Sequence, residues 1–485
     1  MTLDTRPPEV KTPQKFVGSG EYFAYVAMAF LFMNLNGMAG KFRDFYLTSI
    51  LELDQNALSI IGVITMAVPV FLAFFFTMIV DRPPKPGKDK FKPILLMSAI
   101  PLAIATVLMF WVPAPLRGIT VTAMIVYQCV VHIIQRAAEF FANTNELLVM
   151  VMTPNIKEQQ NIISVRGIAG AIGNSGPFLV VFVMGLLIAD QYRMFMVSSV
   201  ICAVATAVMY LAGSRVVKER IPYNPKRENP LLGFWDVLRN PSARLLMYTE
   251  FIREFRGIAS HMGVFMAELL LGSGANFMIF GLPTGIGTLV GMLIVKQIML
   301  KRFDARKTML ISGGYSMVIN TMAFGAGVLA FRNAGVLIYQ VIFVAFLFLI
   351  GLQYGASNLL PPMFHADVVE DLELETNKRL EASVGYARGL SNNISRTIRA
   401  GVAPRVLMGF VGYVQPIDGV VQPQTYRTQI RMTGVYTLVQ GLFMLLGALP
   451  FIWYKLTGER RAQVHEQVKL RREQMAELER ELKQD

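Results

Sequence analysis

Arginine and asparagine residues form a regular polar stripe within one long stretch of small and apolar residues. Arg388, Asn392, Arg396 and Arg399 follow one another at steps of four, four and three residues, which places them on one face of a helix. Planar guanidinium groups bind carboxylate, sulfate or phosphate groups through paired hydrogen bonds. No acidic residue follows Glu381 in this stretch. The stripe predicts that Arg388, Asn392 and Arg396 bind an anionic substrate, unless acids elsewhere in the chain compensate them.

A second polar stripe, within residues 119–151, carries both signs of charge. It consists of His132, Gln135, Arg136, Glu139, Asn143 and Glu146. Arg136 and Glu139 are three residues apart and can neutralise each other on one helix, so a purely structural salt bridge is one interpretation. Glu146 has no basic residue of its own helix well placed to neutralise it. We expect Arg136, Asn143 and Glu146 to contact a substrate, and Glu139 and Glu146 to accept protons.

A third group of charges, in residues 245–270, could complete the first stripe. It contains Glu250, Arg253, Glu254, Arg256 and His261. Glu254 could pair with an arginine of residues 380–410 or with Arg166, which would make these side chains a structural network. The same residues could also bind substrate, and the sequence leaves both interpretations open. Glu254 is the third candidate proton acceptor.

The elements that must position these side chains are long apolar segments. Hydrophobic residues make up 54% of the 485 residues and charged residues only 16%, and about 20 apolar residues cross a hydrocarbon core of roughly 30 Å. The sequence predicts an all-α membrane protein with twelve transmembrane helices. The predicted segments are 22–47, 57–80, 93–112, 119–151, 162–188, 194–213, 245–270, 276–300, 308–331, 334–361, 380–410 and 432–454.

Basic residues predict the orientation of these helices. With both termini in the cytoplasm, the inner loops hold about 22 basic residues and the outer loops about five, as the positive-inside rule requires. The net charge of +13 therefore reflects topology, and no nucleic-acid partner is expected. Lys41, Arg43 and Asp44 are expected at the outer membrane interface, where long side chains reach the headgroups.

The segments divide into six and six around a polar loop, which suits a carrier whose halves rock around a central site. We expect a cytoplasmic segment, a six-helix bundle, a cytoplasmic loop, a second six-helix bundle and a charged helical tail. Their respective boundaries are 1–21, 22–213, 214–244, 245–454 and 455–485.

The sequence offers little support for an enzyme or a metal protein. Cys129 and Cys202 lie in apolar runs, and the four histidines are scattered. No metal-ligand spacing, nucleophile motif or phosphate-binding loop is visible. We therefore expect no metal and no cofactor.

Short motifs in the predicted loops carry a family resemblance. The first is Asp81-Arg82 with Gly87 and Lys92-Pro93, the second Thr153-Pro154 with Glu158 and Arg166, and the third Ala366-Asp367 with Glu373, Lys378-Arg379 and Glu381. Together they resemble the glycoside, pentoside and hexuronide:cation symporters, the melibiose-carrier-like branch of the major facilitator superfamily. The resemblance implies the major facilitator fold, alternating access, and sugar transport driven by sodium or protons. It also implies gating roles for Asp81, Arg82, Asp367, Glu373, Arg379 and Glu381, and sugar contact for Arg166.

The sequence departs from this family at its cation site. Sodium-coupled members carry two aspartates in the second helix, at positions that correspond to Pro69 and Ala73. Hard cations need oxygen ligands, so a proton is the expected coupling ion and sodium is doubtful. A sugar-binding acid of the fourth helix corresponds to Ala142, and a lysine of the eleventh to Asn393.

These observations favour a secondary transporter of a small anionic solute, such as a uronide or an acidic glycoside. We expect a monomer in contact with membrane lipids, as a multi-pass protein of a bacterial plasma membrane. Two alternatives stay open. One is a transporter of an amphipathic lipid such as a lysophospholipid, and the other is a membrane sensor or assembly partner that does not transport.

Overall fold

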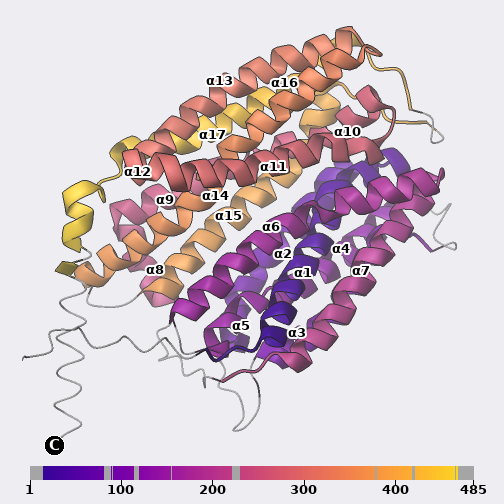
Figure 1. Cartoon of the computed structure of the whole chain (residues 1–485). Helices are drawn as coiled ribbons and strands as arrows, with labels where there is room; N and C mark the ends of the chain where they lie inside the picture. Colours follow the sequence, from indigo (N-terminus) through magenta and orange to yellow (C-terminus); the bar gives the residue numbers. More distant parts are fainter. Residues whose placement is uncertain are drawn as a thin grey trace, which may run out of the picture.

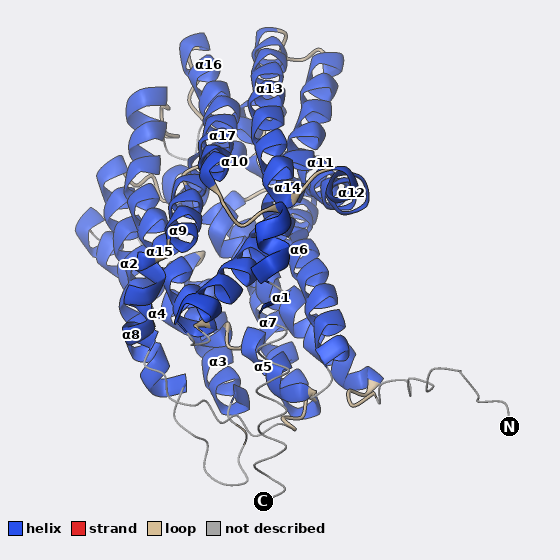
Figure 2. Ribbon diagram, turned by 90° about the vertical axis from the view of Figure 1, so that its left-hand side faces the viewer, coloured by secondary structure: helices blue, strands red, loops and turns tan. Residues whose placement is uncertain are grey.

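The computed structural model describes residues 15–80, 89, 91–113, 120–153, 156–220, 230–376, 380–417, 421–464 and 466–467. These residues form helices joined by short loops, and no β-strand occurs among them (Figure 2). The predicted all-α class is therefore confirmed.

The first helices of the chain pack side by side and are called the N-terminal group. Helix α1 lies between α6 and α7, while α3 contacts α4 and α7, and α2 contacts α4. The group consists of α1 (Ser19–Phe45) with its π-helical continuation Tyr46–Ile50, α2 (Gln55–Val80), α3 (Phe91–Met109), α4 (Val121–Ala142), α5 (Asn145–Met152), α6 (Ile156–Leu187) and α7 (Gln191–Val216).

The remaining helices are called the C-terminal group, in which α14 packs against α11 and α13, and α15 against α9 (Figure 1). They are α8 (Pro230–Arg239), α9 (Pro241–Glu254), α10 (Gly257–Leu271), α11 (Met278–Ile294), α12 (Leu300–Arg302), α13 (Ala305–Arg332), α14 (Leu337–Thr376), α15 (Glu381–Arg405), α16 (Tyr426–Gly434) and α17 (Gln440–Ala448). The 3₁₀ segments Gly274–Phe277 and Leu449–Trp453 and the π-helical segments Val295–Met299, Val406–Val411 and Val435–Val439 join or extend them.

Polar side chains in the loops fix where several of these helices begin. Asp190 accepts a hydrogen bond from the backbone N–H of Tyr192, and Asp304 accepts one from that of Lys307. Asn240 accepts one from the backbone N–H of Ala243. Each bond satisfies a donor that the first helical turn leaves without a partner. The loops thus set the start of α7, α9 and α13.

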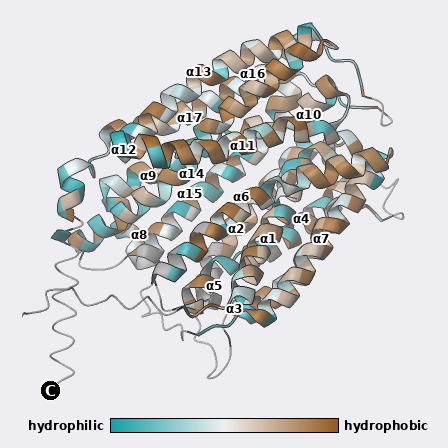
Figure 3. Ribbon diagram, viewed as in Figure 1, coloured by the Kyte–Doolittle hydropathy of each residue, from teal (hydrophilic) through white to brown (hydrophobic). Residues whose placement is uncertain are grey.

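Ten helical segments of the described residues are long and apolar enough to cross a membrane. Hydrophobic residues cover much of the helical surface, whereas hydrophilic ones gather near α12 (Figure 3). The two predicted segments outside this set are 245–270, which is divided between α9 and α10, and 380–410, in which α15 carries several arginines. The count of twelve transmembrane helices therefore stays a prediction.

Two predicted segments, 119–151 and 245–270, are each divided into two helices. Residues 119–151 form α4 and α5 with a break at Asn143 and Thr144. The hydroxyls of Tyr25 and Tyr210 donate to the carbonyls of Asn145 and Ala142 on either side of it, at 3.0 and 3.4 Å. Hydropathy alone misses such a break because both parts are apolar.

Two segments outside the predicted transmembrane spans also contain helices. The predicted loop 214–244 contains helix α8, and α7 extends into it. Residues 458–464 of the predicted tail are helical, whereas residues 468–485 lie outside the described residues.

The two groups of helices touch along α2 and α15, and also where α10 and α11 meet α1 and α6. Ser59 of α2 donates to the carbonyl of Gly401 at 3.2 Å, and Gln415 donates to the carbonyl of Leu53 at 2.5 Å. These contacts lie toward the end of the molecule that holds the loop 51–54. We call it the closed end.

Glycines allow α11 and α14 to approach closely. Gly287 and Gly291 lie on α11, opposite Gly351 and Gly355 on α14, and both pairs have the spacing found at tight helix crossings in membranes. A Cβ atom at Gly351 would lie 2.3 Å from the carbonyl oxygen of Thr284. Any side chain there must therefore push the two backbones apart.

We expect Gly351→Leu to destabilise the protein by about 3 kcal/mol, since overpacking against rigid backbone forces helices to shift. A thermal melt of the purified protein in detergent should show a lower midpoint and a lower folded yield. Gly325→Leu is the matched control, because a Cβ atom at Gly325 of α13 would meet nothing within 4 Å. Equal melting of the two variants would contradict the tight crossing.

Candidate functional site

The polar stripe of α15 faces α9, whose acids compensate part of its charge. Glu250 of α9 is only 3% exposed and accepts hydrogen bonds from the Nε of Arg388 at 2.8 Å and from the amide of Asn392 at 3.3 Å. His365 of α14 lies 3.2 Å from the same carboxylate. Arg388 and Asn392 therefore share one acidic partner.

One turn along α9, Glu254 binds the other two arginines of the stripe. Arg396 reaches its carboxylate through Nε at 3.2 Å, and Arg399 does so through Nη1 at 3.2 Å. The same Nη1 donates to the backbone carbonyl of Glu254 at 2.9 Å, which caps the end of α9. Gly257 makes this approach possible, since a Cβ atom there would lie 2.0 Å from Nη1 of Arg399. The predicted pairing of Glu254 with the arginine stripe is thus present.

The stripe of α4 meets this network from the N-terminal group. Arg136 donates to Glu139 at 2.5 Å, as the spacing on one helix predicts, and Gln135 donates to the same carboxylate at 3.2 Å. Glu139 also lies close enough to Arg396 for their charges to interact. The two groups of helices therefore bring opposite charges close to each other.

A further polar contact joins the groups at the closed end. Asp44 of α1 contacts Nδ1 of His261 of α10 and also binds Nη2 of Arg43 at 2.6 Å. Lys41 donates to the carbonyl of Asn174, and its ammonium lies 4.0 Å from the centre of the Phe178 ring.

The expectation that these α1 charges reach the lipid headgroups is wrong. Asp44 and Arg43 are largely buried, and the contact between Asp44 and His261 lies between the two groups. The physical reason is that an acid of one group and a histidine of the other satisfy each other. Lys41 likewise finds a carbonyl and an aromatic face on α6.

Glu146 and Arg166 form a separate pair within the N-terminal group. Nη2 of Arg166 on α6 lies 3.1 Å from the Glu146 carboxylate on α5. The partner of Glu146 is thus the arginine that the family resemblance assigned to sugar contact. Asn143 is exposed at the break between α4 and α5. The structure does not join this pair to the α9 and α15 network through any described hydrogen bond.

Sequence reasoning missed two residues, a partner of Glu250 and a buried acid. His365 lies beside Glu250, and its sequence context gave no sign of this because the contact comes from α14. Glu268 is a lone acid in the apolar helix α10 and is 4% exposed. A single carboxylate within an apolar run was the available signal.

The predicted gating residues lie away from this network where the structure describes them. Asp367 near the end of α14 binds Nε of Arg461 at 2.9 Å, which ties the tail helix to α14. Glu373 lies in α14 as well, and Glu381 begins α15. Asp81, Arg82 and Arg379 lie outside the described residues.

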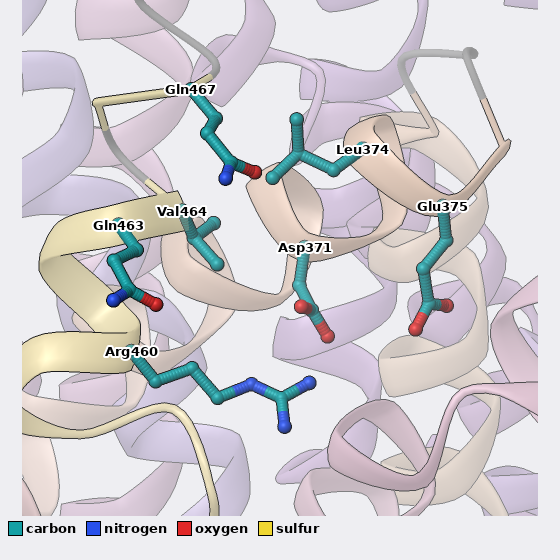
Figure 4. A pocket seen from close by; sticks show the side chains of 7 residues that line it. All are labelled: Asp371, Leu374, Glu375, Arg460, Gln463, Val464 and Gln467. Carbon is teal, nitrogen blue, oxygen red and sulfur yellow. The ribbon is translucent and has the colours of Figure 1, made fainter.

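A pocket of about 270 Å³ is found beside the tail helix (Figure 4). Asp371 and Glu375 of α14 face Arg460 and the glutamines of the tail across it. Both acids also accept hydrogen bonds from the amide of Asn240, at 3.0 and 3.1 Å. The pocket therefore belongs to the docking of the tail and not to the network of α9 and α15.

The chemistry of the network is that of an incompletely neutralised cationic site. Around Glu250 and Glu254 lie the arginines Arg253, Arg256, Arg388, Arg396 and Arg399. Positive charge thus exceeds negative charge. Arg396 is 47% exposed despite its position on this helix, and Nε of Arg399 and Oδ1 of Asn392 have no hydrogen-bond partner within the described residues. Such a site can bind an anion.

Residues 22–458 match the family described as MFS/sugar transport protein. This chain belongs to that family. The resemblance to cation symporters that the loop motifs predicted is confirmed, and this MFS protein is a membrane transporter and not an enzyme. A relative with 24% identity over 397 residues is named an uncharacterized symporter, YjmB, of Bacillus subtilis (strain 168); the match covers 78% of this chain and 79% of the relative.

Solved structures with a similar fold are transporters as well. The nucleoside transporter NupG has a TM-score of 0.58 at 14% identity, covering 89% of this chain and 98% of its own. The xylose transporter XylE from E. coli has a TM-score of 0.57 at 11% identity, covering 90% of this chain and 97% of its own. These likenesses show the transporter fold for this MFS protein. A multi-pass protein of a bacterial plasma membrane agrees with the Bacillus relative.

Proposed function

We propose that this protein carries a small organic anion, such as a uronide or another acidic glycoside, together with a proton by alternating access. The observation that supports it most is the half-exposed Arg396 within an arginine-rich network on α9 and α15. A carboxylate on the substrate would pair bidentately with a guanidinium. The residues proposed to bind it are Arg136, Asn143, Glu146, Arg166, Arg388, Asn392 and Arg396.

Coupling follows from competition for the arginines. A substrate anion that binds Arg396 leaves Glu254 with one fewer guanidinium partner, and Glu254 can then accept a proton. Glu139 beside Arg136 and Glu146 beside Arg166 offer the same exchange. Anion and proton together add no net charge to the site, so both can cross at a low electrostatic cost. Pro69, in the interior of α2, supplies no oxygen ligand from its side chain for a sodium ion.

The proposed topology has twelve transmembrane helices in two bundles of six, with both termini in the cytoplasm. Helices α9 and α10 together form the seventh, interrupted, membrane segment, and α15 forms the eleventh. Interrupted helices commonly border the binding site of secondary transporters. The closed end then faces outward and the tail helix faces the cytoplasm. We propose that a monomer carries out transport.

The test is uptake of a radiolabelled alkyl glucuronide into proteoliposomes, driven separately by a proton gradient and by a sodium gradient. We expect the proton gradient alone to drive uptake, and the corresponding neutral glucoside to be a poor substrate. Arg396→Gln should lower the uptake rate at least about tenfold, the loss of one charged contact. Arg193→Gln, at an exposed position in the first turn of α7, is the matched control.

Three results would overturn parts of this proposal. Uptake driven only by sodium would refute proton coupling, and equal uptake of the neutral glucoside would refute the anion site. Flux of a labelled lysophospholipid in place of the glucuronide would favour the lipid alternative.

A further inference from the structure

Glu268 differs from the other buried carboxylates of the described residues. Four such carboxylates have a basic or amide partner: Glu21 binds Arg220 at 2.7 Å, Glu250 binds Arg388 at 2.8 Å, Asp367 binds Arg461 at 2.9 Å, and Asp371 binds the amide of Asn240 at 3.0 Å. Glu268 is 4% exposed, and its hydrogen-bond partner is the hydroxyl of Tyr413 at 3.0 Å. No basic side chain compensates it within the part of the chain that the structure describes.

The surroundings of Glu268 form part of the contact between the two groups of helices. His261, Phe265 and Glu268 lie on one face of α10. The Phe265 ring lies 5.4 Å from Phe45 of α1 and 5.0 Å from Tyr413. Helix α10 approaches the N-terminal group at this point (Figure 1). Glu268 is therefore buried behind a junction that must open if the closed end opens.

The charged residues on the elements that pack against α10 do not pair with Glu268. Helix α10 packs against α1, α15, α16, α17 and the segments 274–277 and 435–439. Of their described ionisable residues, Asp44 contacts His261, Arg396 and Arg399 bind Glu254, and Arg431 binds the carbonyl of Phe410. Tyr413 alone interacts with Glu268. The remaining ionisable residues on these elements are Glu21, Tyr22, Tyr25, Lys41, Arg43, Glu381, Tyr386, Arg388, Arg405, Tyr426, Arg427 and Tyr436.

We propose that Glu268 is a proton-binding residue of the gate, which takes up a proton when the closed end closes and releases it when that end opens. Burying an isolated carboxylate anion costs several kcal/mol or more, whereas the neutral acid can be buried against a hydroxyl. The step is an acid–base equilibrium: a hydronium ion of the solution at that end gives its proton to a carboxylate oxygen and becomes water. No other bond changes. This inference rests on the proposed transport cycle only in requiring that the two groups separate.

Proton uptake on closure determines how pH shifts the balance between the closed and the open end. Closing binds one proton, so lower pH favours the closed end and higher pH favours the open end. One proton per closure changes the ratio of closed to open molecules by up to about tenfold per pH unit. Glutamine at this position resembles the protonated acid, so Glu268→Gln should keep the end closed at every pH.

The experiment measures the distance between the two groups in the full-length protein without any substrate. Spin labels are attached to cysteines introduced at the exposed Arg193 and Ala334, one on each group near the closed end. Cys129 and Cys202 are first replaced by alanine. Distance distributions are recorded in lipid nanodiscs from about pH 5 to about pH 8. Because no substrate is present, failure of the substrate proposal leaves this result interpretable.

We expect the short-distance population to decrease as pH rises, and to stay large at all pH values in Glu268→Gln. Glu268→Met tests the same point with an apolar side chain of similar length, should the glutamine variant fold poorly. His261→Gln should retain the pH dependence. A constant population in the unmodified protein, or an unchanged pH dependence in Glu268→Gln, would overturn the proposal. Loss of the pH dependence in His261→Gln would assign it to the contact with Asp44 and overturn it as well.

Discussion

Glu254→Gln is expected to lower the uptake rate at least about tenfold, which corresponds to roughly 1.4 kcal/mol. Glu254 holds both Arg396 and Arg399 on α15. Removal of its charge leaves two guanidinium groups without their acid, and breaking a fully buried pair in this way costs about 3–5 kcal/mol. Because Arg396 is half exposed, the cost at that contact is smaller. Initial rates in proteoliposomes and the thermal midpoint in detergent measure the two effects.

The double variant Glu254→Gln with Arg399→Gln measures the interaction between the two side chains, apart from the effect of removing each one alone. If the two side chains act together, the second substitution should cost less in the presence of the first than alone. Glu459→Gln, at an exposed position of the tail helix, controls for the loss of a carboxylate. A normal uptake rate in Glu254→Gln would show that the network has no part in transport.

A disulfide across the closed end is expected to abolish uptake almost completely. A Cβ atom at Gly62 of α2 would lie 3.2 Å from the Cβ of Ala400 on α15, which is slightly shorter than the usual spacing of about 3.5–4.5 Å in disulfides. Gly62→Cys with Ala400→Cys, in a variant lacking Cys129 and Cys202, would join the two groups covalently. Alternating access requires these groups to separate at each end in turn. Oxidation of the two cysteines should therefore stop substrate uptake, and reduction of the disulfide should restore it.

Each single cysteine variant, treated with the same oxidant, is the control for damage by the substitution itself. Mass spectrometry of the oxidised protein confirms that the bond has formed. Full uptake by the cross-linked protein would mean that the two groups need not separate between α2 and α15 during transport.

Hydropathy was sufficient to predict an all-helical protein, because the backbone hydrogen bonds of a helix form between residues close in the sequence. A backbone in hydrocarbon must satisfy its hydrogen bonds within the helix, so long apolar segments predict helices directly. Three- and four-residue spacing likewise predicted the bond between Arg136 and Glu139, since both lie on one helix. The loop motifs predicted the family, and the match over residues 22–458 confirms it.

Residue spacing could not predict which charged side chains on different helices pair with each other. From the sequence, the candidate partners of Glu254 were the arginines of residues 380–410 and Arg166. In the structure, α15 approaches α10 at Gly257 and brings Arg396 and Arg399 to Glu254. Arg166 instead pairs with Glu146. Asp44 was expected among headgroups and instead contacts His261.

The sequence by itself determined which segments are helices, which residues carry charge within them, and the family. Only the tertiary structure decided which charges meet, where helices α4 and α9 end, and that Glu268 has a tyrosine and, among the residues that the structure describes, no base beside it. The reason is physical. Helix formation depends on neighbours a few residues away, whereas an ion pair between helices depends on their rotation and crossing, which close backbone contacts at glycines set.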